Sequence, residues 1–253
     1  MTEPSFEDRR LSFGSEASSY ADLRPGYPPE AARWILDGAD LPVREVADVG
    51  AGTGAFTRLL VDHGLGVTAY EPDPGMLAEL AVRVPDVLRT VAPAESLPLE
   101  DAAVDAVTVA QAWHWFDKAA AGREFVRVVR PGGVIGLLWN VRDDRVPWMG
   151  LMSDIVGSEA SMRPSFAEIR AIHPDVEQAD FSHVVAMSPD DIVRLASTFS
   201  YVRLRSDSET VYSSLRELLA THPDTAGRDL IDVPYVTATY RIPVHRREVG
   251  GSD

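Results

Sequence analysis

The sequence has 253 residues, of which 45% are hydrophobic, so it is long enough for one large α/β domain with a substantial core. Its 24 Lys and Arg against 39 Asp and Glu give a formal net charge of -15, which repels phosphate backbones and anionic lipid surfaces, so we expect no nucleic-acid partner. The chain contains no cysteine, which excludes disulfides, thiolate metal sites and a cysteine nucleophile, and this fits a reducing cytoplasm.

The start of the chain predicts neither a signal peptide nor a membrane span. Residues 1–10 are polar, with no apolar core behind a basic start. No apolar run in the sequence approaches the roughly 18 residues that a spanning helix needs. We therefore expect no membrane partner.

Residues 20–29 read Tyr-Ala-Asp-Leu-Arg-Pro-Gly-Tyr-Pro-Pro and form what we call the proline segment. Its prolines end one helix and preset the first turn of the next, which we expect over residues 29–37. The aromatic and cationic residues Tyr20, Arg24 and Tyr27 are unusual for a linker. The residues alone leave two interpretations open, namely hinge packing with a surface charge, or a lid over a ligand.

Residues 45–60 carry the pattern around which the chain is organised, Glu-Val-Ala-Asp-Val-Gly-Ala-Gly-Thr-Gly-Ala-Phe-Thr-Arg-Leu-Leu. An apolar run ends at Val49 and helix-compatible apolar positions resume after Gly54, so a buried strand turns sharply into a helix here. Gly50, Gly52 and Gly54 lack a Cβ, so the backbone can take positive φ and approach a ligand beside free helix N–H groups. A tight turn without a ligand is the alternative.

Two nucleotide-like ligands fit this loop. Gly50, Gly52 and Ala55 satisfy the loose dinucleotide pattern, and Glu71 lies 21 residues after Gly50, where a ribose-binding acid is expected. Asp48, in contrast, is unfavourable beside a pyrophosphate and useful beside an ammonium group. The run that starts at Asp48, Asp-Val-Gly-Ala-Gly-Thr-Gly, resembles the first motif of the class I S-adenosylmethionine-dependent methyltransferases.

This resemblance implies S-adenosyl-L-methionine as the cofactor. It implies that the loop binds it through Asp48, Gly50, Ala51, Gly52, Thr53 and Gly54. The Tyr-x-x-x-Arg-Pro-x-Tyr-Pro order of the proline segment is similar to the opening segment of a methyltransferase subgroup that includes trans-aconitate methyltransferases, where it folds over the cofactor. The resemblance therefore favours a lid in which Tyr20 and Arg24 reach the cofactor and Tyr27 reaches the substrate.

Residues 66–71 read as a second parallel strand that ends in an acid, Glu71. A carboxylate at a carboxyl strand end can accept hydrogen bonds from both ribose hydroxyls, whereas a solvated charge is the alternative. Pro72 then leads into a helix. Met76 on that helix is placed either against an adenine face or in the core.

A third strand is expected over residues 87–92, followed by Ala94 and Glu95. The resemblance implies that Glu95, or the backbone at Ala94, accepts a hydrogen bond from the adenine amine, and a turn with a helix cap is the structural alternative. A fourth strand over 104–110 ends at Gln111, which the resemblance also places at the cofactor.

The stretch after Gln111 reads Ala-Trp-His-Trp-Phe-Asp and places three aromatic rings and a histidine at a strand end. Such a cluster is most often core, but in the resembled fold it lies beside the reactive methyl, so we expect Trp113, Trp115 and Phe116 to contact the substrate. His114 is the candidate catalytic base, and its alternative is a purely structural role within the aromatic wall.

Further along the chain, strand and helix patterns keep alternating. A Pro-Gly-Gly turn at 131–133 precedes a fifth strand over 134–139, and beyond Asn140 we expect a helix over 147–159, an irregular insertion over 160–174, a sixth strand over 184–187, helices from 188 and over 211–220, and a terminal strand over 235–244. This order predicts a doubly wound, Rossmann-like, mostly parallel seven-stranded sheet with helices on both faces. The last strand should be antiparallel and at the sheet edge.

We divide the chain into an N-terminal lid (residues 1–30), an adenosylmethionine-binding core (31–140) and a C-terminal part of the same domain with a substrate-side insertion (141–253). Scattered histidines without cysteine predict no metal site, and no Gly-x-Ser-x-Gly elbow indicates a hydrolase. The expected function is a cytoplasmic methyltransferase acting on an O, N or C atom of a small molecule, such as those of specialised metabolism. The alternatives are a nicotinamide-dependent oxidoreductase and an adenosylmethionine-binding protein without methyl transfer; the sequence leaves the oligomeric state open.

Overall fold

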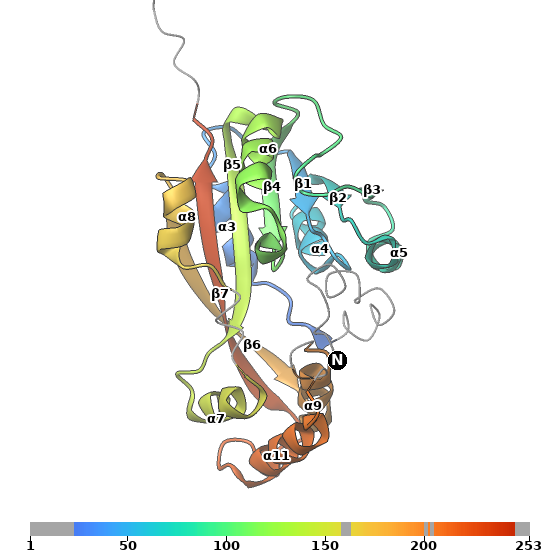
Figure 1. The fold of residues 1–253 in the computed structure, drawn as a ribbon, viewed down its shortest axis with the longest axis vertical. Helices are drawn as coiled ribbons and strands as arrows, with labels where there is room; N and C mark the ends of the chain where they lie inside the picture. Colours follow the sequence, from blue (N-terminus) through green and yellow to red (C-terminus); the bar gives the residue numbers. More distant parts are fainter. Residues whose placement is uncertain (1–22, 158–162, 200–201, 203–204, 246–253) are drawn as a thin grey trace, which may run out of the picture.

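A computed structural model describes residues 23–157, 163–199, 202 and 205–245. These residues form one seven-stranded sheet with the strand order β3-β2-β1-β4-β5-β7-β6 (Figure 1). The strands are β1 (Glu45–Val49), β2 (Gly66–Tyr70), β3 (Leu88–Thr90), β4 (Val104–Ala110), β5 (Val129–Arg142), β6 (Glu177–Met187) and β7 (Ile231–Pro243). The first five strands run parallel to one another, and β7 is antiparallel to both β5 and β6. The predicted Rossmann-like fold is confirmed.

Helices cover both faces of this sheet (Figure 1). On one face, Phe125 of α6 and Ile169 of α8 belong to the same buried cluster as Val107 and Leu137 of the central strands. On the other face, a second cluster joins α3 and α4 to the sheet. The helices are α3 (Pro29–Leu36), α4 (Ala55–Asp62), α5 (Pro74–Arg83), the short 3-10 helix η2 (Trp113–Trp115), α6 (Lys118–Val128), α7 (Pro147–Val156), α8 (Phe166–Ile172), α9 (Pro189–Ser197) and α11 (Ser208–Thr221).

The position of β7 corrects the expectation of a terminal edge strand. β7 lies inside the sheet between β5 and β6, and β6 forms the edge. Thr237 and Thr239 of β7 are fully buried. Their hydroxyls are satisfied there, because Thr237 donates to the side chain of Asn140 and Thr239 donates to the carbonyl of Ala179.

Several boundaries also differ from the sequence-based ones. The Pro-Gly-Gly stretch at 131–133 is a bulge inside a longer β5, since the register with β4 shifts between the pairs Val104–Val129 and Ala106–Val134. Strand β3 is shorter than expected, and β6 begins at Glu177 rather than at 184. The stretch predicted to be irregular contains α8, whose start is fixed by a capping box between Ser165 and Glu168.

Three helices, α7, α9 and α11, pack together around the far ends of β6 and β7, away from the rest of the sheet (Figure 1). We call this part the C-terminal lobe. Its buried cluster includes Met149 and Met152 of α7, Leu195 of α9, Leu215 of α11 and Tyr235 of β7. β7 therefore contributes both to this cluster and, through Tyr240 and Ile242, to the cluster that contains Phe125 of α6. Within the described residues, no helix is long and apolar enough to cross a membrane.

Candidate functional site

The three glycines after β1 adopt the backbone that the sequence predicted, with φ values of +67° at Gly50, +55° at Gly52 and +88° at Gly54. They nevertheless differ in what surrounds them. A Cβ at Gly50 would lie 2.5 Å from the Ala112 side chain, and one at Gly54 would lie 2.9 Å from Leu80. A Cβ at Gly52 would meet no atom within 4 Å. Only at Gly52, therefore, does the missing side chain leave open space that a ligand can use.

This open space belongs to a cavity at the carboxyl ends of β1, β2 and β4, under the proline segment. Most of the predicted site residues line it together, namely Arg24, Tyr27, Asp48, Gly50, Ala51, Gly52, Thr53, Glu71, Pro72, Met76, Ala94, Glu95, Gln111, Trp115 and Phe116. Gly54, Trp113 and His114 do not line it. Gly54 is the N-cap of α4, where a Cβ would meet Leu80 of α5, and its predicted contact with the cofactor stays a prediction. Tyr20 lies outside the described residues.

Asp48 is a buried acid at the floor of this cavity. Its two carboxylate oxygens accept hydrogen bonds from the Thr57 hydroxyl at 2.6 Å and the Thr108 hydroxyl at 2.8 Å. Burial raises the pKa of Asp48 from 3.8 to about 6, although both hydroxyls act in the opposite direction. A cationic group bound in the cavity would favour the ionised form of this carboxylate.

Glu71 connects the end of β2 to the glycine loop. One oxygen of its carboxylate accepts from the Gly52 amide, and the other accepts from the Asp73 amide, both at 3.0 Å. The side chain is largely buried and lines the cavity. A carboxylate oxygen can accept more than one hydrogen bond, so these backbone contacts fix Glu71 while leaving acceptor capacity for ligand hydroxyls.

Met76 and Glu95, both predicted to lie near the adenine, line the same cavity. Met76 lies at the start of α5, where Asp73 caps the helix, and its side chain is both buried and part of the cavity wall. Glu95 accepts a hydrogen bond from the Asp117 amide at 2.8 Å, so it also holds the start of α6. Both interpretations of Glu95, as a residue of the ligand cavity and as a residue that holds a helix start, therefore have a structural basis.

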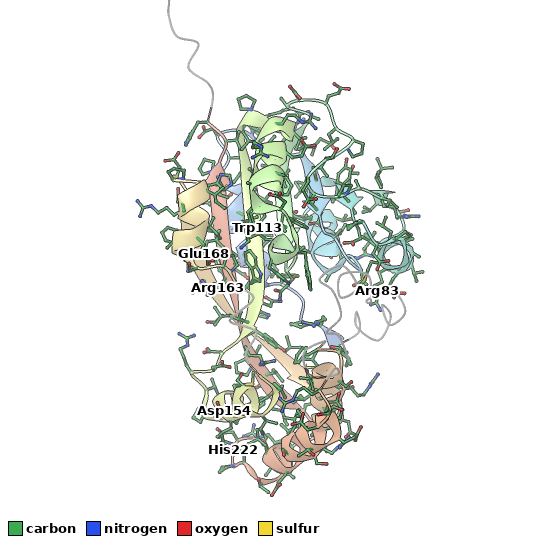
Figure 2. All side chains as sticks on the ribbon, viewed as in Figure 1. Arg83, Trp113, Asp154, Arg163, Glu168 and His222 are labelled. Atoms are coloured by element: carbon green, nitrogen blue, oxygen red, sulfur yellow. The ribbon has the colours of Figure 1, made fainter. Side chains whose placement is uncertain are left out.

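The aromatic stretch divides between core and cavity. Trp113, labelled in Figure 2, is only 1% exposed. It packs against Phe116 and Phe125, with ring centroids 6.2 and 6.1 Å apart. It is therefore core, which corrects the expectation that it contacts the substrate. Trp115 and Phe116 do line the cavity, and their contact with the substrate stays a prediction.

His114 lies on the 3-10 turn between these residues but not on the cavity wall. Burial, followed by the positive charge of Lys118, lowers the pKa of His114 from 6.5 to about 4, so the imidazole is neutral near pH 7. Its Nδ1 atom is buried, with no hydrogen-bond partner among the described residues. In this structure His114 is thus a neutral base without direct access to the cavity, and its catalytic role stays a prediction.

Gln111 is one of two non-glycine residues in the described chain with positive φ, at +59°. This backbone is unfavourable for a side chain and is found most often where function requires it. Gln111 Nε2 donates to the backbone carbonyl of Asn140 at 2.9 Å, which links the ends of β4 and β5 at the cavity.

The sequence analysis missed seven cavity residues, namely Pro25, Ala55, Phe56, Asp73, Ala110, Ala112 and Asn140. Asn140 is the most informative of them, because it is a buried polar residue at the carboxyl end of a strand. A polar residue that ends an apolar strand is a signal that could have identified it. Among the described residues, no group of three or more potential metal ligands comes together.

The fold and this loop-lined cavity define a class I, Rossmann-like methyltransferase. Comparison with known proteins supports this class, since a model described as a methyltransferase domain matches residues 47–137. An uncharacterized methyltransferase of Mycobacterium tuberculosis is 40% identical over 237 residues, covering 92% of this chain and 96% of the relative. A methyltransferase-like protein of Schizosaccharomyces pombe is 32% identical, covering 90% and 94%. The chain belongs to the methyltransferase family.

Solved structures agree with the fold. A structure from Anaeromyxobacter dehalogenans, described as a type II methyltransferase, superposes with a TM-score of 0.67 at 24% identity. The match covers 88% of this chain and 99% of that one. A Haemonchus contortus phosphoethanolamine N-methyltransferase bound to S-adenosyl-L-methionine covers 95% of this chain and 60% of its own, with a TM-score of 0.56 and 16% identity. The [4+2]-cyclase SpnF also shares the fold, with a TM-score of 0.53 at 18% identity over 96% of this chain and 99% of that one.

Proposed function

We propose that this methyltransferase uses S-adenosyl-L-methionine to methylate an O, N or C atom of a small molecule. The observation that carries the proposal is the pairing of Gly52 with Glu71, which places an open, Cβ-free backbone position next to a fixed carboxylate. The neighbouring structure with bound S-adenosyl-L-methionine supports the same cofactor. The residues present fit such a ligand in both shape and charge.

In this proposal, Glu71 binds the ribose hydroxyls and the backbone at Gly52 lies against the methionine part. Buried Asp48 supplies the negative charge that favours a cation in the cavity. Met76 and the Ala94 backbone border the adenine. The cofactor supplies an electrophilic methyl carbon, so the protein mainly has to align the acceptor with it, and orientation alone can lower a barrier by roughly 7–11 kcal/mol.

Two features support a small acceptor. The formal charge of -15 disfavours nucleic acid and anionic membranes as substrates, and the cavity wall includes the aromatic residues Tyr27, Trp115 and Phe116. Aromatic walls suit small, partly apolar molecules. We place the reaction in the cytoplasm because the chain contains no cysteine.

The test is a parallel calorimetric titration with S-adenosyl-L-methionine, S-adenosyl-L-homocysteine and NADH. We expect the protein to bind the first two compounds and not NADH. Binding of NADH alone would favour the nicotinamide-dependent oxidoreductase instead. A screen of small hydroxyl, amine, carboxylate and carbon acids for methyl transfer follows. Cofactor binding without methylation of any acceptor class would favour a non-methyl role, as in the cyclase that shares the fold.

A further inference from the structure

The proline segment has no helical or strand structure between residues 24 and 28, yet it covers the cavity through Arg24, Pro25 and Tyr27. A segment of this kind keeps one position only if contacts from elsewhere hold it. Its proline residues restrict the backbone but form no hydrogen bonds through nitrogen. Hydrogen bonds to its carbonyl groups therefore help to set how the cavity is covered, beside the ring contacts of Arg24 with Phe199 and of Tyr27 with Phe56.

The side chain of Asn140 holds two of these carbonyls. Its Nδ2 donates to the carbonyl of Gly26 at 2.9 Å and to that of Pro25 at 3.3 Å. The amide is 2% exposed, so water does not compete for these hydrogen bonds. Asn140 lies near the carboxyl end of β5 and pairs with β7 there, more than 110 residues further along the chain than Gly26.

A second residue fixes the orientation of this amide. The hydroxyl of Thr237, directly opposite Asn140 in the β5–β7 pair, donates to Asn140 Oδ1 at 2.5 Å. His183 Nδ1 lies 3.4 Å from the same hydroxyl. A rotated amide would place its oxygen against two carbonyl oxygens and its NH₂ group against the donating hydroxyl, so one orientation is selected.

We propose that Asn140 is a positioning residue that fastens residues 24–28 of the proline segment over the cofactor cavity, and that Thr237 acts through it. Fastening keeps Arg24 and Tyr27 in place before any ligand binds. Loss of it lowers the fraction of molecules whose cavity is correctly covered, and the apparent affinity for cofactor falls by the same fraction. This affinity effect rests on the proposed function, whereas the fastening itself does not.

Thr237→Val is the decisive variant, because Thr237 does not line the cavity and valine keeps its shape in the strand. Thr239→Val is the matched control. Thr239 lies on the same strand, is equally buried and also donates its hydroxyl, but to Ala179 on β6, away from the proline segment. Thr237→Ser, which retains the hydroxyl, is the conservative rescue.

The first measurement is amide hydrogen exchange of Arg24, Gly26 and Tyr27 without ligand. We expect exchange about ten-fold faster in Thr237→Val and in Asn140→Ala, and unchanged rates in Thr239→Val and Thr237→Ser. Equal rates in Thr237→Val and Thr239→Val would overturn the proposal. If Thr237→Val does not fold, Asn140→Ala against wild type decides by the same readout.

The second measurement is the affinity for S-adenosyl-L-homocysteine by calorimetry. We expect affinity about ten-fold weaker in Thr237→Val and near the wild-type value in Thr239→Val. A loss in Asn140→Ala without any loss in Thr237→Val would show that Asn140 contacts the ligand directly, and would overturn its positioning role. Absence of binding to the wild-type protein would reject the proposed function, while the exchange result would still decide the fastening.

Discussion

Glu71 and Gly52 are joined by a hydrogen bond of 3.0 Å, in which the backbone amide of Gly52 donates to the carboxylate of Glu71. The bond spans the gap between the ends of two neighbouring parallel strands, β1 and β2. It makes the glycine loop and the proposed ribose acceptor one structural unit, so a change in either residue affects both.

We expect Glu71→Ala to weaken binding of S-adenosyl-L-homocysteine by about 1.5–3 kcal/mol, because charge-assisted hydrogen bonds are lost. The matched control is Glu79→Ala on α5, whose carboxylate pairs with Arg83 at 2.8 Å outside the cavity wall. Calorimetry measures both. Equal affinity of the two variants for S-adenosyl-L-homocysteine would show that Glu71 has only a structural role.

Gly52→Val should abolish cofactor binding in a protein that still folds, because the new side chain enters the open cavity. Gly64→Val is the control, since Gly64 also has positive φ, at +78°, with no neighbour within 4 Å, but lies at the opposite end of α4. Both variants share the backbone strain. Thermal unfolding and calorimetry separate strain from a blocked site, and the hypothesis fails if Gly52→Val binds as Gly64→Val does.

Asp48 should make stability depend on pH. Burial raises its pKa from 3.8 in the unfolded chain to about 6, so between these values the folded protein binds more protons. The contribution of Asp48 to the free energy of unfolding therefore decreases as pH rises from about 4 to about 6, and this contribution should be absent in Asp48→Asn. Denaturant titrations at several pH values measure it, with the exposed Asp86→Asn as control. A wild-type and an Asp48→Asn profile of the same shape would contradict it.

The same group should couple cofactor binding to proton release. A sulfonium or ammonium cation near Asp48 stabilises the carboxylate and lowers its pKa, so S-adenosyl-L-methionine should bind more tightly as pH rises through about 6. Calorimetry near pH 5.5 in buffers of different ionisation enthalpy detects the released proton. Asp48→Asn should release none, and equal release from both proteins would exclude Asp48 as its source.

His114→Gln should leave kcat within about three-fold of the wild-type value, because His114 does not line the cavity. Since burial lowers its folded pKa to about 4, the unfolded chain binds more protons between about 4 and 6.5, and His114 should add stability as pH rises over this range. Steady-state kinetics of His114→Gln and of the wild-type protein check the prediction on kcat. A decrease in kcat of roughly 10²-fold or more with unchanged cofactor affinity would show that His114 acts as the catalytic base.

The glycine loop, Glu71 and the paired aromatic wall could be predicted because each is encoded in a short stretch of sequence. The directions of neighbouring side chains could not. In a 3-10 helix successive residues point about 120° apart, so Trp113 enters the core, Trp115 reaches the cavity and His114 points elsewhere. Gly54 similarly shares its motif with Gly52 but faces α5.

Contacts between distant parts of the chain also could not be predicted from the sequence. Asn140 became part of the site only through Pro25, Gly26 and Thr237, which lie about 100 or more residues away. The hydroxyl partners of Thr237 and Thr239 on β7 also come from other strands. Polar residues satisfied by remote partners cannot be distinguished from surface residues by periodicity.

The interior position of β7 has a consequence for how the protein acquires its structure. Strand β5 ends at Arg142 and its partner β7 starts at Ile231, so the pairing closes a loop of almost 90 residues. Pairings this far apart in sequence form slowly, because loop closure costs entropy before the contacts are gained. During synthesis, β5 and β6 each present an unpaired edge until β7 leaves the ribosome, which is when the nascent chain most needs protection from aggregation.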